Sequence, residues 1–243
     1  MRAQVRLENV KNAALLLVDV ALKTPLMRNE NLAQQFESNI VLKREDLQQV
    51  RSYKIRGAYN KIASLTQSEL KHGVVCASAG NHAQGVAFSC FKLKVKGVVF
   101  MPTPTPKQKI EQVKMFGGSF IEIVIVGDTF DDAYVCANQY CKENEMTFVH
   151  PFDDEKVIEG QATIALEILE QSKNEIDYLF VPVGGGGVAS GISSIFNELS
   201  PNTKVIGVEP YGAPSMSTSL EKGVNVKLDY IDKFIDGASV QRV

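Results

Sequence analysis

The sequence predicts an α/β protein in which two open parallel-sheet domains, each covered by helices, enclose a cleft. Short apolar runs with the composition of buried strands alternate with longer amphipathic segments along the chain, which is the pattern of βαβ units. Several of the expected strands end in glycine- or serine-containing turns that open a helix. Strand ends and helix starts gather at the cleft of such folds, so we expect the chemistry of the protein there.

The first unit begins with a helix over residues 7–22, where apolar side chains recur at helical spacing and Pro25 blocks continuation. A short buried strand is expected at 40–42. A helix with Ile62 and Leu65 on its inner side follows the loop after this strand. The strands expected next are 74–77, 98–101 and 120–126, with helices through 86–93, over 106–116 and over 129–144, the last capped by Asp128.

The second unit is expected to begin near Pro151. Helices are expected over 158–169 and 188–199, a buried strand over 178–181 and a further strand over 205–208. No linker rich in serine, proline or glycine separates the two units, so they should pack directly together.

Composition restricts the classes of function. The 243 residues carry a formal net charge of −2, with 44% apolar and 22% charged residues, so the basic surplus typical of nucleic-acid binding is missing. No apolar run is long enough to span a bilayer, and no signal peptide is recognisable. The four cysteines lack metal or redox spacing and the three histidines are scattered, so we expect no metal site. A cytoplasmic enzyme with a small-molecule substrate is the default expectation.

Lys54 is the candidate catalytic residue. It lies in the stretch 50–58, where the loop after the strand at 40–42 becomes a helix. The field at a helix start disfavours a cation and helps to release its proton, and a neutral amine is the form that attacks a carbonyl. The alternative is an ordinary surface lysine beside Arg51 and Arg56.

Four consecutive glycines, Gly184, Gly185, Gly186 and Gly187, follow an expected strand and open a helix. We call them the tetraglycine. Glycine lets the backbone approach a ligand closely, and several N–H groups at a helix start can converge on an anion such as phosphate. The alternative is a tight turn in which the glycines only relieve strain.

The tetraglycine also fits a dinucleotide fingerprint, Gly184-x-Gly186-x-x-Ala189, with Glu209 at the end of the next strand, where a ribose-binding acid belongs. A nicotinamide-dependent Rossmann oxidoreductase is therefore a second hypothesis. Against it, this unit lies late in the chain and leaves the Lys54 stretch without a role.

A second strand-to-helix turn is rich in polar groups. Its members are Ser78, Ala79, Gly80, Asn81 and His82. The serine hydroxyl, the asparagine amide and the backbone N–H groups suit a carboxylate. The alternative is a plain helix cap by Ser78 or Asn81, with His82 as a solvated helix residue.

Together these three stretches require a ligand with a phosphate, a carbonyl that condenses with lysine and a polar ring. Pyridoxal 5'-phosphate has all three. The tetraglycine would take the phosphate, Lys54 the carbonyl, and Asn81 the ring oxygen. Such a cofactor supplies an electron sink, and the protein supplies orientation.

The motifs at 52–58, 78–85 and 183–187, in this order, resemble the threonine/serine dehydratases among the fold-type II (tryptophan synthase β-like) pyridoxal-phosphate enzymes. The similarity covers essentially the whole chain, includes 42–46 and 160–163, and is greatest to the biosynthetic threonine dehydratase (threonine ammonia-lyase) branch.

Matched residue by residue, the resemblance implies that Lys54 is the Schiff-base lysine and that Asn81 and the tetraglycine bind the cofactor. It also implies that the turn at 78–82 binds the substrate carboxylate. Tyr53 takes the place beside the cofactor ring that phenylalanine often holds. A tyrosine can stack there equally well, so this departure is mild.

The resemblance further implies a large cofactor domain of residues 1–69 and 148–243, with a small α/β domain of residues 70–147 inserted in it, and a dimer or tetramer. Family chains continue beyond Val243 and supply a partner for the pyridine nitrogen there. We therefore expect the large domain to be incomplete in this chain, which alone should bind the cofactor weakly and turn over little threonine.

The implied activity is α,β-elimination, which converts L-threonine to 2-oxobutanoate and ammonia in the first step of isoleucine biosynthesis. The freed amine of Lys54 would remove the Cα proton. Serine dehydration or racemisation and cysteine synthesis occur on the same fold and stay as alternatives. The sulfur-using branches usually carry a Thr-Ser-Gly-Asn loop in place of the turn at 78–82. A truncated relative that only binds a ligand or partner is the non-enzymatic alternative.

Overall fold

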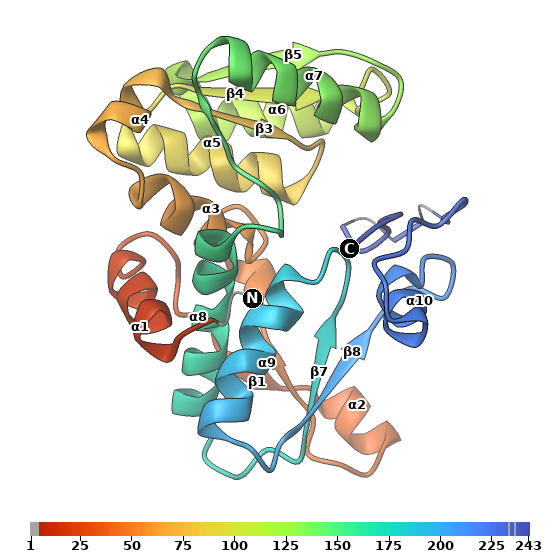
Figure 1. The fold of residues 1–243 in the computed structure, drawn as a ribbon. Coiled ribbons are helices and arrows are strands. Elements are labelled where there is room, and N and C mark those ends of the chain that lie inside the picture. Colours follow the sequence, from red (N-terminus) through yellow and green to blue (C-terminus); the bar gives the residue numbers. More distant parts are fainter. Residues whose placement is uncertain (1–4, 233, 236) are drawn as a thin grey trace.

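The computed structural model describes residues 5–232, 234–235 and 237–243, which form two halves, one above the other in Figure 1. Four parallel strands make the sheet of the upper half, in the spatial order β5-β4-β3-β6. They are β3 (Val74–Ala77), β4 (Gly97–Met101), β5 (Ile121–Ile125) and β6 (Thr147–Phe148). The predicted alternation of helices with parallel strands is confirmed in this half.

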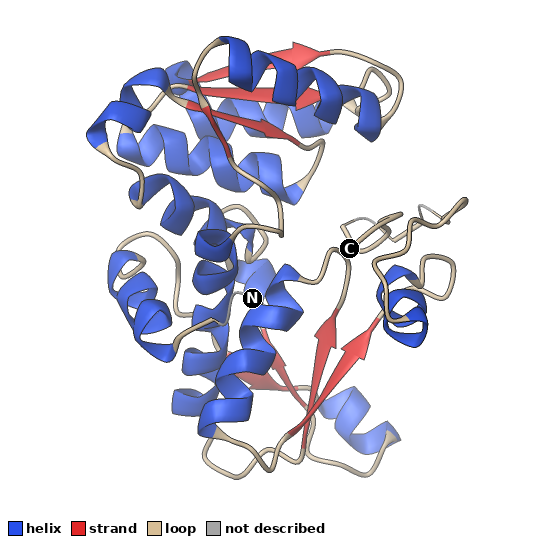
Figure 2. Ribbon diagram, viewed as in Figure 1, coloured by secondary structure: helices blue, strands red, loops and turns tan. Residues whose placement is uncertain are grey.

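Helices cover both faces of this sheet (Figure 2). The helices are α5 (Asn81–Leu93) and α6 (Lys107–Gly117) on one face, α7 (Phe130–Glu143) on the other, and α4 (Gln67–His72), which leads into β3. Val74 and Cys76 of β3 belong to the apolar cluster under α5, whereas Val75 between them belongs to the cluster under α7. Because successive side chains of a strand point to opposite faces, a strand covered on both faces is apolar throughout.

The lower half is built on helices that pack side by side. α8 (Glu155–Gln171) contacts both α3 (Lys54–Ala63) and α9 (Gly187–Leu199), and α1 (Leu7–Leu16) packs on α8. A second apolar core, which includes Ile195 and Phe196, forms where α8 and α9 meet. The other elements of this half are two strand pairs, a helix after each pair's last or first strand, and a 3-10 turn: the parallel pair β7 (Tyr178–Pro182) and β8 (Lys204–Val208), α10 (Ser215–Lys222), the antiparallel pair β1 (Leu26–Arg28) and β2 (Val41–Lys43), α2 (Glu30–Gln35) and the turn Glu45–Leu47. A second 3-10 turn, Gly118–Phe120, joins α6 to β5 in the upper half.

Both neighbours of α3 approach it at backbone distance. A Cβ atom on Gly57 would lie 2.6 Å from a backbone oxygen of α8, and one on Gly160 of α8 would lie 2.6 Å from the carbonyl oxygen of Arg56. On the other side, a Cβ atom on Gly85 of α5 would lie 3.0 Å from the carbonyl carbon of Lys54. A side chain at any of these positions would push the helices apart. The three glycines therefore let α3 lie between a helix of the upper half and one of the lower half.

Several predicted helix ends were wrong. The first helix ends at Leu16, before the predicted end at residue 22, because the chain turns there and buries Leu17 and Val20. Thr129, and not Asp128, caps α7 in a capping box with Asp132, whose N–H donates to the Thr129 hydroxyl at 3.1 Å.

The strands of the lower half are less buried than predicted. Tyr178 and Phe180 of β7 are 52% and 63% exposed, and Val41 and Leu42 of β2 are 42% and 38% exposed. One face of β7 packs on the apolar core with α9, and no element among the described residues covers Tyr178 and Phe180 on the other face. An apolar run does not reveal by itself whether one or both faces of its strand are covered.

A buried arginine joins α3 to α8 and to the turn after β2. Arg56 is 1% exposed and donates to both oxygens of Glu45 at 2.8 and 2.9 Å. It also donates to both oxygens of Glu167 at 2.7 and 3.0 Å, and to the hydroxyl of Thr163 at 3.1 Å. Such forked contacts fix orientation as well as position. They hold the first turn of α3, which begins with Lys54.

All four cysteines are free, and Cys76, Cys90 and Cys141 are buried while Cys136 is half-buried. Within the described ranges, no helix combines the length and the apolar character that crossing a membrane requires.

We expect Arg56→Met to lower the free energy of unfolding by about 3–5 kcal/mol, because it leaves the nearly buried carboxylate of Glu45 without its positive partner and that of Glu167 with Lys43 alone. Arg44→Met is the matched control, since it removes an exposed arginine–carboxylate pair with Asp46. This control should have no measurable effect. Urea unfolding followed by circular dichroism measures both variants, and equal midpoints would contradict the assigned weight of the Arg56 contacts.

Candidate active site

Lys54 is the first residue of α3, and Tyr53 occupies the N-cap position before it. The Nζ atom of Lys54 donates to the carbonyl oxygen of Pro151 at 2.6 Å and lies 5.5 Å from the centre of the Tyr53 ring. Burial lowers the pKa of Lys54 from 10.5 to about 8. Lys54 is therefore no ordinary surface lysine. Near neutral pH part of its amine is unprotonated and able to act as a nucleophile or base.

The turn before α5 has open hydrogen-bond donors. Gly80 is the N-cap residue and makes no side-chain cap, while the hydroxyl of Ser78 accepts the N–H of Gly80 at 3.2 Å. Ser78, Ala79 and Gly80 are half-buried, and Asn81 is exposed. Neither Ser78 nor Asn81 caps α5, so the alternative interpretation of this turn was wrong. The first N–H groups of a 13-residue helix stay available to an anion.

His82 points away from this open turn. Its side chain is 3% exposed, and its Nε2 atom lies 2.9 Å from the carbonyl oxygen of Val149. Because a carbonyl only accepts, Nε2 carries the proton of the neutral ring. Burial lowers the pKa of His82 to about 3, and Nδ1 has no hydrogen-bond partner in the part of the chain that the structure describes. The alternative interpretation of His82 as a solvated helix residue was therefore wrong.

The tetraglycine forms the turn from β7 into α9. Gly187 begins α9, and Gly186 before it has a φ of +86°, in the left-handed region that favours glycine. Within the described residues, the N–H groups of Gly184, Gly185 and Gly186 have no acceptor. A Cβ atom would lie 2.8 Å from the Gly237 oxygen at Gly184, 2.3 Å from the Phe152 ring at Gly185 and 2.6 Å from the Phe152 oxygen at Gly187. Crowding explains the absence of side chains, and the open donors leave backbone N–H groups available to an anion.

One short segment touches both Lys54 and the tetraglycine. We call residues 150–154 the 150–154 turn. Its Pro151 carbonyl accepts the Lys54 amine, and Phe152 packs against Gly185 and Gly187. The Nδ1 atom of His150 accepts the N–H groups of Phe152 at 3.3 Å and Asp153 at 2.7 Å. No role was predicted for this segment from the sequence, although a histidine before a proline between two units was a usable signal.

Glu209, the acid of the dinucleotide hypothesis, is engaged elsewhere. Its two carboxylate oxygens accept the N–H groups of Met216 at 2.7 Å and Ser217 at 2.8 Å, at the start of α10. A carboxylate that caps a helix in this way is not free to bind a ribose. The dinucleotide hypothesis thereby loses its specific acid.

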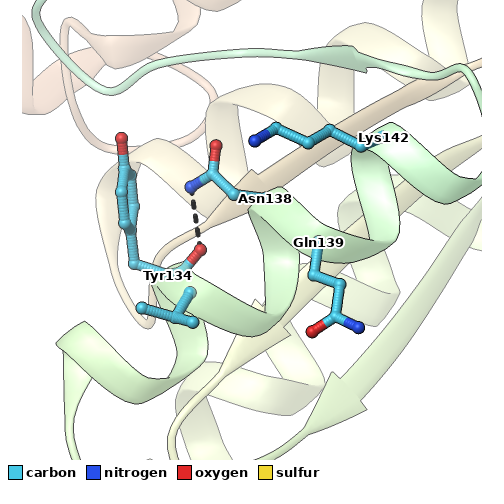
Figure 3. Close-up of a pocket in the computed structure, with 5 residues that line it drawn as sticks. Tyr134, Asn138, Gln139 and Lys142 are labelled. Atoms are coloured by element: carbon cyan, nitrogen blue, oxygen red, sulfur yellow. Dashed lines mark hydrogen bonds between the residues drawn. The ribbon is translucent and has the colours of Figure 1, made fainter.

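A shallow pocket of about 400 Å³ lies along α7 (Figure 3). In it the side chain of Asn138 donates to the carbonyl oxygen of Tyr134 at 2.9 Å, which is a contact within one helix. Its lining residues are Tyr134, Val135, Asn138, Gln139 and Lys142. No group from a second element converges on this pocket, so it has no part in the candidate site.

The residues around Lys54 fit the cofactor predicted from the sequence. A half-buried amine with a lowered pKa suits an aldehyde, and the open N–H groups of the tetraglycine suit a phosphate. The 150–154 turn brings both groups to one place, since it contacts each of them.

Comparisons with known proteins agree with this fit. Residues 18–243 match the family model described as pyridoxal-phosphate dependent enzyme. The chain is 51% identical over 240 residues to "L-threonine dehydratase biosynthetic IlvA" of Halalkalibacterium halodurans, covering 99% of this chain and 58% of that protein. The protein of the same name from Bacillus subtilis is 51% identical, covering 98% of this chain and 57% of that protein. The chain thus spans somewhat more than half the length of these curated relatives.

Solved structures give the same result. The processed form of threonine deaminase isoform 2 from Solanum lycopersicum superposes with a TM-score of 0.92 at 44% identity, covering 97% of this chain and 64% of that chain. Maize serine racemase superposes with a TM-score of 0.92 at 28% identity, covering 98% and 71%. Enzymes with different names thus share this fold. The chain belongs to the pyridoxal-phosphate dependent enzymes, with the α/β architecture of fold type II that its sequence predicted.

Proposed function

We propose that this chain carries the catalytic site of a threonine dehydratase (threonine ammonia-lyase), which converts L-threonine to 2-oxobutanoate and ammonia. The observation that carries the proposal is the half-buried Lys54, with its pKa lowered to about 8, joined through one turn to the open donors of the tetraglycine. The names of the relatives at 51% identity support threonine as the substrate and the first step of isoleucine biosynthesis as the setting.

Lys54 has two tasks in this proposal. Its neutral amine would hold the cofactor through the aldehyde carbon, and the same amine, once free of the cofactor, would take the proton from the substrate α-carbon. Pyridoxal phosphate, when bound, delocalises the electron pair left at that carbon. A general base works best when its pKa lies near the operating pH. The Lys54 pKa of about 8 is close to physiological pH.

The other residues bind and orient. The backbone donors of the tetraglycine would hold the phosphate, the amide of Asn81 would donate to the ring oxygen, and the ring of Tyr53 would lie beside the cofactor ring. Burial raises the pKa of Tyr53 to about 12, so its hydroxyl stays protonated. The substrate carboxylate would bind to the turn residues Ser78, Ala79 and Gly80 and to the start of α5. The hydrogen bond between His82 and the Val149 carbonyl keeps this turn in place.

We also propose the domain division stated above, with residues 70–147 as the small domain between the two segments of the large one. The grouping of β3, β4, β5 and β6 in a single sheet supports this division, although its second boundary falls inside β6. A cytoplasmic homo-oligomer, a dimer or tetramer, completes the proposal. Leu15 and Val18, which are 72% and 69% exposed, support a contact with another copy.

The protein as its host produces it should form 2-oxobutanoate and ammonia from L-threonine when pyridoxal phosphate is present. Pyruvate and D-serine formed from L-serine are measured in the same assay, because a serine racemase has this fold too. D-serine without 2-oxobutanoate would favour the racemase. Cofactor binding without any product would favour a protein that only binds ligands.

Reduction with borohydride after incubation with stoichiometric pyridoxal phosphate should leave the pyridoxyl group on Lys54, and peptide mapping by mass spectrometry locates it. Lys54→Ala should lose the label, and Lys71→Ala, which changes an exposed lysine, should keep it. Burial also lowers the pKa of Lys43, but that amine is paired with Glu167 and should stay unlabelled. Label on Lys43 or Lys61 would overturn the assignment.

Asn81→Ala should keep the label on Lys54 but shift the absorbance of the bound cofactor and slow turnover, because the ring oxygen loses a donor. The variant should fold as stably as the wild type, since Asn81 is exposed. Visible absorption spectra and steady-state rates test this role. An unchanged spectrum together with an unchanged rate would leave Asn81 without a role in the site.

A further inference from the structure

We propose that His150 is a positioning residue for Lys54 and acts through the single peptide group between Pro151 and Phe152. A positioning role for His150 matters to catalysis only if Lys54 has the role proposed above. The contacts of His150 themselves are observed independently of that role. His150 touches neither the lysine amine through a hydrogen bond nor the tetraglycine, and its effect passes through the backbone of the 150–154 turn.

The two ends of one peptide group carry the link. Its carbonyl, from Pro151, accepts the Lys54 amine at 2.6 Å, and its N–H, from Phe152, donates to Nδ1 of His150 at 3.3 Å. A peptide group is planar, and its C=O and N–H point in opposite directions. Holding the N–H therefore fixes the direction of the carbonyl. The pyrrolidine ring of Pro151 restricts the same segment further, because it fixes φ.

The His150 ring is itself held on several sides. Its centre lies 4.7 Å from the Phe152 ring in an edge-to-face contact, and 6.2 Å from the rings of both Phe148 and Tyr134. Phe148 belongs to β6 and Tyr134 to α7, so the upper half of the molecule positions the imidazole. The imidazole in turn positions the carbonyl that holds Lys54. A series of contacts thus connects Phe148 and Tyr134 of the upper half, through His150, to the Lys54 amine on α3.

The link requires a neutral imidazole. Nδ1 accepts two N–H groups, the second from Asp153 at 2.7 Å, so it has to present its lone pair and the ring proton must be on Nε2. Protonation of the ring would place a hydrogen on Nδ1, facing two donors, and the turn would open.

Burial is the largest influence on the pKa of His150 and lowers it below the ordinary 6.5. Asp153 and Asp154 raise this pKa and Lys54 lowers it, while His82 on α5 also interacts with the ring and is itself kept neutral by burial. The phenol of Tyr134 faces the ring from α7. Because the pKa of His150 is lowered overall, the imidazole is neutral at pH 7 and the 150–154 turn is intact. The turn opens only when the pH falls far enough to protonate the ring.

Two substitutions distinguish the contribution of the Nδ1 lone pair from that of the rest of the His150 side chain. His150→Ala removes the acceptor, so the turn should open and admit water to Lys54. His150→Asn keeps an acceptor, because an asparagine side-chain oxygen accepts N–H groups two and three residues further on in an Asx turn, and it does not titrate near neutral pH. The asparagine variant is therefore the matched control for the alanine variant.

The first readout is the apparent pKa of Lys54 in the cofactor-free chain, taken from the pH dependence of its acylation by trace acetic anhydride and measured by mass spectrometry. We expect about 8 in the wild type and in His150→Asn, and a shift toward the ordinary 10.5 in His150→Ala. The same value in all three proteins would overturn the proposal. If Lys54 behaves as expected but the borohydride label lies on another lysine, the proposed function fails and the positioning role stands.

The second readout does not depend on the stability of the alanine variant. Protection factors for the amide hydrogens of Phe152 and Asp153 should fall in the wild type as the pH drops below 6.5, and should stay constant in His150→Asn over the same range. Circular dichroism at each pH shows whether the fold is intact. Equal pH dependence in the two proteins would mean that His150 does not hold the turn, and the proposal would fall.

Discussion

The burial of α3 between α5 and α8 is the constraint on which the rest of the structure depends. Three glycines let the helices meet at backbone distance, and Arg56 fixes the first turn of α3 through two carboxylates. Because α5 belongs to the upper half and α8 to the lower one, this packing also joins the two halves. Lys54, at the start of this helix, is half-buried, and its pKa is lowered whichever ligand the protein binds.

The chemistry follows from that burial. An amine without a carboxylate partner loses part of its preference for the charged form when it is desolvated, and for Lys54 desolvation is the cause of the lowered pKa. Packing thus lowers the pKa of Lys54, which makes the amine a nucleophile, and unpaired backbone N–H groups are available to bind an anion. Neither effect depends on a side chain of opposite charge beside Lys54 or the tetraglycine. This arrangement differs from that of Lys43, which is also buried but lies against Glu167.

Local patterns allowed much of this to be predicted from the sequence. The parallel sheet of the upper half followed from apolar runs, and Lys54 and the tetraglycine stood out because each lies where a predicted helix begins. The buried state of Arg56 did not follow, because its partners Glu45 and Glu167 are 11 and 111 residues away in the sequence. The bond between His82 and Val149 and the exposure of Phe180 likewise depend on distant elements, which periodicity within a segment does not report.

The buried thiols of the upper half have a practical consequence. Burial raises the pKa of Cys90 to about 12 and that of Cys76 still further, so neither forms appreciable thiolate at neutral pH. Oxidants and alkylating reagents should therefore meet Cys136 first, which is half-buried on α7. Modification of Cys76, in the central strand β3, requires the sheet to come apart. The native sequence thus contains its own chemical reporter for opening of the upper half.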